Sequence, residues 1–560
     1  MVSKVISLVY KEVRGLHQAA YVLGIFAFGS QLLALVRDRL LAHRFGAGIE
    51  LDIYYTAFRI PDLMFVLFAS TLSVYVLIPF VAERVRNDKN GGAKHLLAQM
   101  FTLFLFVYVV LATIVWVLTP VIVTYAFPGF VGEMDTLVTL IRILLLQPLL
   151  LGMSSLFGVV TQLGHRFILY AVSPLLYNIG IIIGIIYFYP YLGLSGLAWG
   201  VVLGATAHFL VQVPLVQKSK LSFGLTGAID WKTIWEVLTV SVPRAITLAM
   251  HQVTLLVLSG IASVMTAGSV AVFQFAYNLQ SVPLAIIGVS YSTAAFPLLA
   301  DLFAQKKIEA FRVHVTTALR HIIFWSLPVV AMFIVLRAQV VRVILGSGEF
   351  GWEDTRLTAA SLAILTASLL AQAVNLLLLR VFYAGGLTRL PFLVTLFGSL
   401  SSVVFTGVLY VMYNSLPEFS RAIDHSLRIT DVPGSEVVVI AIGYGIGIVL
   451  QSSLLLFLII RTYSLSTDWL WPHVSRSLTA STAGAFGAYL ALNIFAYFFN
   501  TDTFLTIFAQ GLIAGMVGLI LIIIAYYLLH SPELVEIYRS IRRRLFKSKK
   551  NIVVSNDDVL

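Results

Sequence analysis

The sequence predicts an all-α protein that crosses a membrane many times, and two observations carry that prediction. Apolar residues make up 59% of the 560 residues and charged residues only 11%, against roughly 25% charged in an average soluble domain. Apolar segments of about 20 residues, the length that a helix needs to span a hydrocarbon core, recur along the whole chain. The chain has no cysteine, which excludes disulfides, thiolate nucleophiles and cysteine-ligated metals.

We expect about fourteen transmembrane helices. In chain order they fall near residues 17–41, 53–82, 94–118, 133–163, 168–189, 193–216, 233–260, 268–300, 312–336, 356–384, 389–413, 436–462, 472–499 and 504–529. The segment before the first helix lacks the small-residue cleavage site of a secretory signal, so we expect no cleaved leader.

The links between these segments predict the topology. Lysine gathers in links that alternate helices place on one side, at 83–94, 217–232, 301–312 and 541–550. By the positive-inside rule that side is the cytoplasm, and an even number of helices puts both termini there. The net charge is +11, and because the basic residues occupy these short links, they indicate orientation in a membrane rather than nucleic-acid binding.

An internal repeat appears at an offset of about 220 residues. Ala-Phe at 57–58 and Pro-Phe-Val-Ala-Glu at 79–83 correspond to Ala-Tyr at 276–277 and Pro-Leu-Leu-Ala-Asp at 297–301. The repeat predicts two six-helix halves related by a pseudo-two-fold axis along the membrane normal, with a substrate site between them. The expected parts are an N-terminal half at 1–216, a C-terminal half at 217–462, an extra helix pair at 463–530 and a basic cytoplasmic tail at 531–560.

Charge concentrates where the first two apolar segments meet, within residues 28–83. Arg37, Asp38, Asp52 and Arg59 all lie close to this junction. In a bilayer such charges must face protein or water. One interpretation is that they snorkel to the interface and neutralise one another. The other is the mouth of a polar cavity that receives an anionic head group.

Sequence motifs at this junction are those of a known family. The chain carries Val36-Arg37-Asp38, Phe45-Gly46-Ala47-Gly48, Asp52 and Ala57-Phe58-Arg59-Ile60-Pro61-Asp62-Leu63. Further blocks follow in the family's order at 174–180, 268–299, 380–384 and 388–391. In these motifs the chain resembles the MurJ/MviN family of lipid II flippases, within the multidrug, oligosaccharidyl-lipid and polysaccharide exporter superfamily.

The resemblance implies a transporter of a bacterial cytoplasmic (inner) membrane, not an enzyme. Its cargo would be the undecaprenyl-diphosphate-linked peptidoglycan precursor, moved by alternating access from the inner to the outer leaflet. A central cationic cavity would bind the head group, and a groove beside the last two helices would hold the lipid tail. The resemblance implies no cofactor and no metal, with coupling to the membrane potential or to an ion such as sodium. Membrane lipids and other cell-wall synthesis proteins are the expected partners, and nucleic acid is not.

The resemblance also suggests site residues. Arg37, Asp52 and Arg59 match the family pattern directly, and Asp38 belongs to the same motif. At two positions where family members usually carry arginine, this chain has Gln31 and Asn278 instead. Both amides could hydrogen-bond a sugar or a phosphate, but without charge.

Two further arginines within apolar segments are candidates for the cavity. Arg244 follows Pro243 near the start of the seventh predicted helix, and a proline there can free a backbone carbonyl and kink the helix. Arg142 lies early in the fourth. The alternative for both is an arginine near a helix end that snorkels to the head groups.

Other functions remain open from the sequence. An exporter of another polyprenyl-linked glycan, or a multidrug exporter of the same superfamily, would share the fold. A membrane enzyme is disfavoured, because the interfacial links show no acidic or histidine motif for metal or acid–base chemistry. A non-transporting scaffold is disfavoured by the charged junction.

Histidine, glycine and the tail receive structural interpretations. His208 and His251 are expected to hydrogen-bond neighbouring helices rather than to shuttle protons. The glycines of 441–450 are expected to allow close helix packing, because no strand precedes them as a dinucleotide-binding loop would require. In the tail, Leu534, Ile537, Ile541 and Leu545 follow helical spacing, which predicts a short amphipathic helix on the membrane surface.

Overall fold

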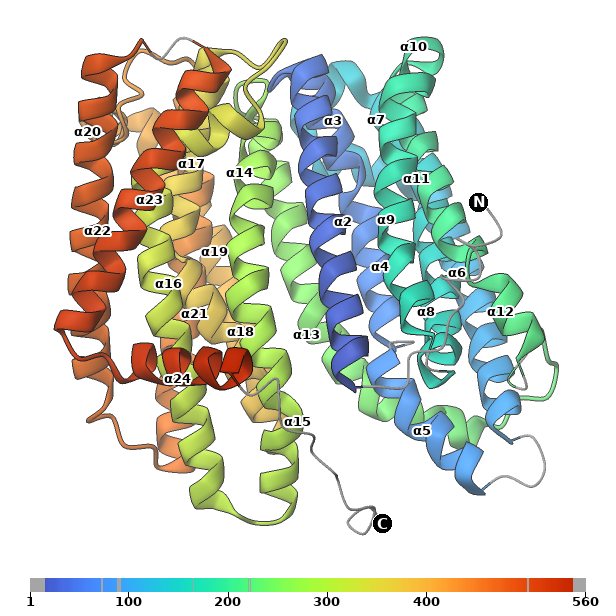
Figure 1. Cartoon of the computed structure of the whole chain (residues 1–560). Helices are drawn as coiled ribbons and strands as arrows, with labels where there is room; N and C mark the ends of the chain where they lie inside the picture. The colour runs from blue at the N-terminus through green and yellow to red at the C-terminus, as the bar shows by residue number, and fades with distance from the viewer. Residues whose placement is uncertain are drawn as a thin grey trace. The chain divides into compact units, whose positions relative to one another are not determined.

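Helices and the links between them make up the residues that the computed structural model describes, which are 16–71, 74–87, 92–164, 166–219, 221, 223–500 and 503–546 (Figure 1). No strand occurs among them, so the predicted all-α class is confirmed. Eleven helices in this part of the chain are long and apolar enough to cross a membrane, or twelve if one bent pair counts as a single span. The protein is therefore a polytopic membrane protein.

Two of the predicted spans are not among these eleven or twelve. The first, 17–41, coincides with the long helix α2 (Leu16–Phe45), and the second, 53–82, contains a break at Phe58. The count of fourteen and the pseudo-two-fold relation between halves stay predictions.

The chain forms two compact units. The first comprises Met1–Val282, Val340–Ser368 and Gly386–Leu455, and the second comprises Pro283–Gln339, Leu369–Gly385 and Leu456–Leu560. The first unit contains the predicted N-terminal half and part of the C-terminal half, and the second contains the rest of the C-terminal half with the extra helix pair. The division at 216, 462 and 530 stays a prediction.

The first unit holds most of the helices. They are α2, α3 (Ile49–Ala57), α4 (Arg59–Thr71), α5 (Val74–Asn87), α6 (Gly92–Ala126), α7 (Met134–Leu144), α8 (Leu146–Leu163), α9 (Phe167–Ile183), α10 (Tyr189–Leu192), α11 (Leu194–Leu210), α12 (Val213–Lys218), α13 (Trp231–Ser263), most of α14 (Ser269–Leu284), α17 (Trp352–Ala367), α19 (Arg389–Ser415), α20 (Pro417–Leu427) and most of α21 (Val438–Tyr463). Short 3-10 segments occur at Pro128–Glu133 and Ser435–Val437, and a π-helical turn, Gly184–Phe188, continues α9.

Glycine sets the spacing between α9 and α11, which run side by side (Figure 1). Gly180 and Gly184 face Gly200 and Gly204, and a Cβ at any of the four would collide with the backbone of the other helix. Small residues four apart let membrane helices approach closely, which compensates for the absence of a hydrophobic driving force in lipid. The same device acts on α21, where Gly443 lies against α19, as the sequence predicted for this glycine-rich segment.

The packing of α2 and α4 places the charged junction inside the first unit. Helix α2 packs along α9, and α4 packs against both α13 and α8. Between them the chain breaks twice, at Gly46, where φ is +60°, and at Phe58, which separates α3 from α4. The breaks keep the charged residues of both helices within one short stretch of chain.

The second unit contains α15 (Ser290–Ala304), most of α16 (Ile308–Ile344), α18 (Leu369–Ala384), α22 (Leu470–Phe498), α23 (Phe504–Leu528), α24 (Pro532–Phe546) and the π-helical turn Ala285–Val289. Helices α22 and α23 pair along their length, and α24 runs across their direction (Figure 1). Leu534 and Ile537 of α24 pack on a cluster that includes Phe324 and Tyr526. The predicted amphipathic helix is thus present, while the side chains of Ile541 and Leu545 lie outside the described part of the tail.

The buried carboxylate of Glu533 connects the start of α24 to α16 and α22. Glu533 is 3% exposed and accepts hydrogen bonds from Arg320 of α16 at 3.1 and 3.0 Å and from the Ser531 hydroxyl at 2.7 Å. His473 of α22 lies 3.1 Å away. Burial raises the pKa of Glu533, but the hydrogen bonds from Ser531 and Arg320 outweigh it, so the pKa lies below its ordinary value.

Candidate substrate site

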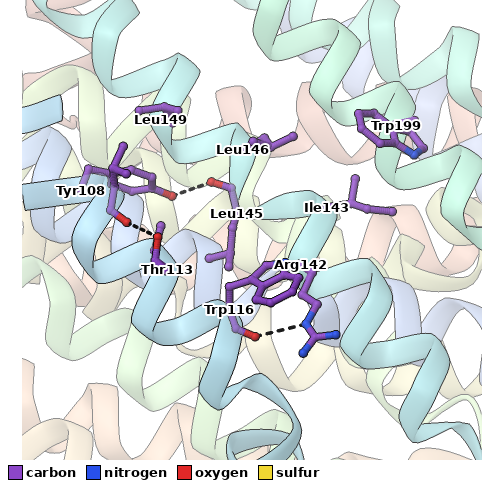
Figure 2. A pocket seen from close by; sticks show the side chains of 11 residues that line it. Tyr108, Thr113, Trp116, Arg142, Ile143, Leu145, Leu146, Leu149 and Trp199 are labelled. Carbon is purple, nitrogen blue, oxygen red and sulfur yellow. Dashed lines mark hydrogen bonds between the residues drawn. The ribbon is translucent and has the colours of Figure 1, made fainter. Parts of the chain in front are cut away.

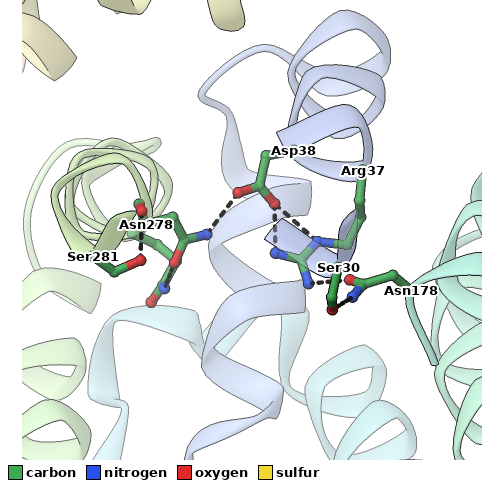
Figure 3. Close-up of polar contacts among 7 residues, drawn as sticks. Ser30, Arg37, Asp38, Asn178, Asn278 and Ser281 are labelled. Atoms are coloured by element: carbon green, nitrogen blue, oxygen red, sulfur yellow. Dashed lines mark hydrogen bonds and ion pairs between the residues drawn. The ribbon is translucent and has the colours of Figure 1, made fainter. Parts of the chain in front are cut away.

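Arg37 and Asp38 form an ion pair within α2 (Figure 3). The Arg37 Nε and Nη2 atoms donate to Asp38 Oδ1 at 2.9 and 2.8 Å. Consecutive helix residues do not normally face each other, so the Arg37 side chain turns back along the helix to make this contact. Its Nη1 atom donates to Asn178 Oδ1 of α9 at 3.3 Å, which ties α2 to its neighbour.

Asn278 of α14 joins the other side of this carboxylate (Figure 3). Its Nδ2 donates to Asp38 Oδ2 at 3.0 Å, while its Oδ1 accepts from Gln274 Nε2 at 2.7 Å. Gln274 and Asn278 are four residues apart and therefore share one helix face. An arginine at position 278 could make the first contact but not the second, because a guanidinium has no acceptor.

Arg59, at the start of α4, completes the chain of contacts. Its Nη2 donates to Gln274 Oε1 at 2.8 Å and its Nε to Ser259 Oγ of α13 at 2.7 Å. Hydrogen bonds thus run without a gap from Arg37 through Asp38, Asn278 and Gln274 to Arg59.

The partners of Arg59 are neutral although the residue is only 5% exposed. No carboxylate within the described residues forms an ion pair with it; Asp62, three residues on, accepts instead from Gln147 at 3.5 Å. A buried guanidinium without a direct counter-ion is costly, and an anionic ligand would relieve that cost.

A small cavity of about 220 Å³ opens between these residues. It is lined by Arg37, Leu41, Tyr54, Tyr55, Phe58, Arg59, Asp62, Tyr177, Ile181, Gln274 and Asn278. The Tyr55 hydroxyl is buried and has no hydrogen-bond partner in the described part of the chain. Buried hydroxyls normally find a partner, so this one is available to a bound ligand.

Asp52 lies apart from the cavity lining. Its carboxylate accepts hydrogen bonds from the backbone N–H groups of Gly268 at 2.6 Å and Ala271 at 2.8 Å, at the first turn of α14. It thereby caps the helix that carries Gln274 and Asn278. The geometry gives Asp52 a positioning role.

Comparison with known proteins places this fold and site in a family. The family model described as "Lipid II flippase MurJ" matches residues 41–509. The chain belongs to the lipid II flippase MurJ family. A "Probable lipid II flippase MurJ" of Rickettsia prowazekii (strain Madrid E) is 24% identical over 416 residues, which is 74% of this chain and 81% of the relative. The "Lipid II flippase MurJ" of Burkholderia cenocepacia is 26% identical over 459 residues, 80% of this chain and 84% of the relative.

Solved structures share the fold. "Lipid II flippase MurJ, inward closed conformation" superposes with a TM-score of 0.70 at 21% identity, covering 90% of this chain and 99% of that one. An inward-facing multidrug resistance MATE family transporter of the MOP superfamily gives 0.63 at 16% identity, covering 78% of this chain and 94% of that one. The family is one of transporters, in agreement with the prediction that the protein is not an enzyme.

Of the two residues at positions where the MurJ pattern expects arginine, only one lines the cavity. Asn278 lines the cavity and bridges Asp38 to Gln274. Gln31 lies half-buried on α2 and is not among the residues that line the cavity. Arg244 lies on α13, but its side chain is outside the described residues, so its role stays a prediction.

Sequence reasoning did not single out Gln274, Ser259, Asn178 or Tyr55 as individual site residues. Gln274 lies within a MurJ-like block and four residues before Asn278, so helical spacing alone would have paired them. The Arg59–Ser259 hydrogen bond joins residues 200 apart in sequence, and no local sequence pattern predicts it.

The two membrane histidines contact neighbouring helices, as the sequence predicted. His208 Nδ1 lies 2.7 Å from Ser154 Oγ on α8, and His251 Nε2 lies 2.9 Å from Tyr277 Oη on α14. Across the described residues, no group of three or more His, Asp or Glu side chains is arranged to hold a metal ion.

Proposed function

We propose that this protein is an alternating-access flippase for lipid II, the polyprenyl-linked peptidoglycan precursor. The observation that carries the proposal is the pair of arginines, Arg37 and Arg59, at one cavity in a membrane protein of the MurJ family. Guanidinium groups match phosphate oxygens in a bidentate way, and both lie where a diphosphate can reach them together.

The energetic need for such a cavity is large. Moving an unpaired charged group into hydrocarbon costs on the order of tens of kcal/mol, so a diphosphate does not cross unaided. The direct partners of Arg59 are the neutral Ser259 and Gln274, so within the described residues its guanidinium has no carboxylate in ion-pair contact and can bind an anion. The unpartnered Tyr55 hydroxyl supplies a further donor for a phosphate or sugar oxygen.

Binding requires the cavity to open. A volume of about 220 Å³ lies below the roughly 300–1,000 Å³ of ordinary small-molecule sites, and the head group of lipid II is larger than a small molecule. We infer that the head group enters when the hydrogen-bond chain separates at Asp38. A diphosphate would then replace Asp38 as the partner of Arg37, so the energy of the broken contacts is recovered in the bound state.

The membrane setting follows from the same proposal. We place the protein in the cytoplasmic membrane with both termini inside, because the lysine-rich links then satisfy the positive-inside rule. Coupling would come from the membrane potential or an ion such as sodium, without a bound cofactor or metal. Other cell-wall synthesis proteins are the proposed partners.

The test is complementation of a bacterial strain depleted of its own lipid II flippase. The wild-type chain is expressed beside Arg37→Ala, Arg59→Ala and the control Arg461→Ala. Arg461 lies near the end of α21, and its guanidinium stacks on Phe457 at 4.9 Å, so it does not line the cavity. Wild type and control should rescue growth, and the two cavity variants should not, at equal membrane abundance.

Failure of a well-inserted wild-type chain would count against lipid II as the cargo. The same assay in strains that lack exporters of other polyprenyl-linked glycans or of drugs would then identify which alternative applies. Rescue by both cavity variants would show that the arginines do not handle the substrate.

A further inference from the structure

A second, larger hollow lies on the outer face of the first unit, between α6, α7, the start of α8 and α11 (Figure 2). It has a volume of about 440 Å³ and shares no lining residue with the substrate cavity. The lining consists of Tyr108, Val109, Ala112, Thr113, Trp116, Arg142, Ile143, Leu145, Leu146, Leu149 and Trp199. We refer to these residues as the outer groove. Its surface is mainly apolar, with a single charged side chain, Arg142.

Arg142 is oriented by a backbone carbonyl that has no hydrogen-bond partner within its own helix. Pro120 lies inside α6 and has no N–H, so the carbonyl of Trp116, four residues earlier, loses its helical partner. Arg142 Nε donates to that carbonyl at 3.1 Å, and the guanidinium lies over the Trp116 ring at 4.2 Å from its centre (Figure 2). Two independent contacts therefore orient one guanidinium.

The two terminal nitrogens of Arg142 remain available. Among the described residues, neither Nη1 nor Nη2 donates to a protein acceptor. The two hydroxyl groups of the groove are satisfied, since Tyr108 Oη donates to the Leu145 carbonyl at 2.6 Å and Thr113 Oγ1 to the Val109 carbonyl at 2.8 Å. An anion at the groove would thus meet one forked donor with no competing acceptor.

The surroundings indicate where that anion comes from. Trp116 and Trp199 are 48% and 43% exposed, and Val109 is 46% exposed, on helices that cross the membrane. Tryptophan gathers at the level of lipid head groups, where one side of the ring is apolar and the other wet. Arg142 lies eight residues after the start of α7, and its guanidinium lies on the side of the groove away from Leu149 (Figure 2). A lipid can therefore bring an acyl chain and a phosphate to the groove together.

We propose that the outer groove binds a membrane glycerophospholipid, with its phosphodiester on Nη1 and Nη2 of Arg142 and an acyl chain along Val109, Leu146 and Leu149. Arginine matches two phosphate oxygens at once, which a mobile side chain achieves only after losing conformational freedom. The carbonyl of Trp116 has already removed much of that freedom. The site differs from simple snorkelling, in which the guanidinium would be held by water alone.

The experiment measures lipid binding to the purified full-length chain by native mass spectrometry in detergent. Palmitoyl-oleoyl phosphatidylglycerol is titrated against palmitoyl-oleoyl glycerol, which has the same chains and no phosphate. The variants are Arg142→Gln, Arg142→Lys, Val109→Trp and the control Arg461→Gln, which removes an arginine stacked on Phe457 at a different helix end. Only variants whose melting temperature equals that of the wild type are compared.

Wild type and Arg461→Gln should bind one phosphatidylglycerol in preference to the diacylglycerol. Arg142→Gln should weaken phosphatidylglycerol binding by about tenfold to a hundredfold and leave diacylglycerol unchanged, because it removes the charge-assisted hydrogen bonds to the phosphate. Arg142→Lys should lose less, since it keeps the charge without the fork. Val109→Trp should fill the groove and weaken both lipids.

Three results would overturn the proposal. Equal phosphatidylglycerol affinity in wild type and Arg142→Gln would show that the guanidinium binds no phosphate. Equal affinity of wild type for the two lipids would reduce the groove to an acyl-chain contact. Displacement of phosphatidylglycerol by a polyprenyl diphosphate at much lower concentration would assign the groove to the transported lipid. If Arg142→Gln does not fold, Arg142→Lys and Val109→Trp carry the same comparison.

Discussion

Asp52 and Gly268 are joined by a 2.6 Å hydrogen bond across 216 residues of sequence. The carboxylate of α3 accepts from the N–H of Gly268, just before α14 begins, and from Ala271 in its first turn. Gly268 has a φ of +96°, and a Cβ there would collide with the Ala47 carbonyl, so the position favours glycine. The break at Gly46–Gly48 and the start of α14 are therefore fitted to each other, and the contact positions Asn278, which lies further along the same helix.

Removing the Asp52 cap should destabilise the protein. We expect Asp52→Ala to lower the free energy of unfolding by about 1–3 kcal/mol, because two N–H groups that bond a charged acceptor lose it. Asp52→Asn keeps one acceptor oxygen and should lose about half as much. The measurement is thermal unfolding in detergent. Unchanged stability of Asp52→Ala would contradict the cap.

The contact between Asn278 and Gln274 should be visible as energetic coupling. Asn278→Ala and Gln274→Ala each break the series of hydrogen bonds between Arg37 and Arg59. The double variant should therefore lose less free energy of unfolding than the two single variants lose in sum. We expect a coupling of about 0.5–3 kcal/mol in a double-mutant cycle on unfolding. Asn278→Ala combined with Asn414→Ala, an exposed amide that shares none of these partners, should be additive.

Glu533 should make the docking of α24 sensitive to acid. Its pKa in the folded protein is depressed, so its stabilisation is complete above the ordinary glutamate pKa and is lost as pH falls through the folded value. The melting temperature of the wild type should therefore drop more steeply below about pH 4.3 than that of Glu533→Gln. Glu309→Gln, at a surface pair with Arg312, should leave the wild-type profile unchanged. Parallel profiles for wild type and Glu533→Gln would refute the assignment.

Glycine should matter for stability at the close α9–α11 contact and not at a helix position that faces open space. Gly200→Ala forces a Cβ against the Gly184 backbone and should lower the free energy of unfolding by about 1–3 kcal/mol. Gly407→Ala on α19 meets nothing within 4 Å and should be neutral or stabilise by up to about 1 kcal/mol. Similar melting temperatures for the two variants would show that close packing does not depend on these glycines.

Local pattern was enough for much of the fold. Apolar segments near the length of a bilayer predicted the helices because lipid offers no partner for a backbone polar group, so each segment must satisfy its own. The glycine spacing of 441–450 also predicted close helix packing, because a glycine leaves room for any neighbouring helix. The break at Phe58, within the predicted span 53–82, was missed, because Phe58 carries no breaker signal of its own.

The candidate site was predicted only in part. Arg37, Arg59 and Asn278 line one cavity, and Asp38 bonds two of them from outside the lining. Asp52 caps a helix and Gln31 lies outside the lining. Composition and motif show which charged residues lie within apolar segments. They do not show whether a carboxylate binds a ligand or caps a helix, because both kinds are buried acids. The difference is which N–H group comes within reach, and that depends on packing.

The sequence by itself determined the class of protein, the run of helices and the concentration of charge at the first two segments. Those properties depend on residue type and local spacing, which the transfer of side chains and backbone into lipid makes decisive. Only the tertiary structure decided that Asn278 bridges Asp38 to Gln274, that Arg59 is held by neutral groups, and that Arg142 takes the carbonyl freed by Pro120. The bonds from Asn278 to Asp38, from Arg59 to Ser259 and from Arg142 to Trp116 join different helices over about 3 Å, a scale at which the packing of whole helices sets the geometry.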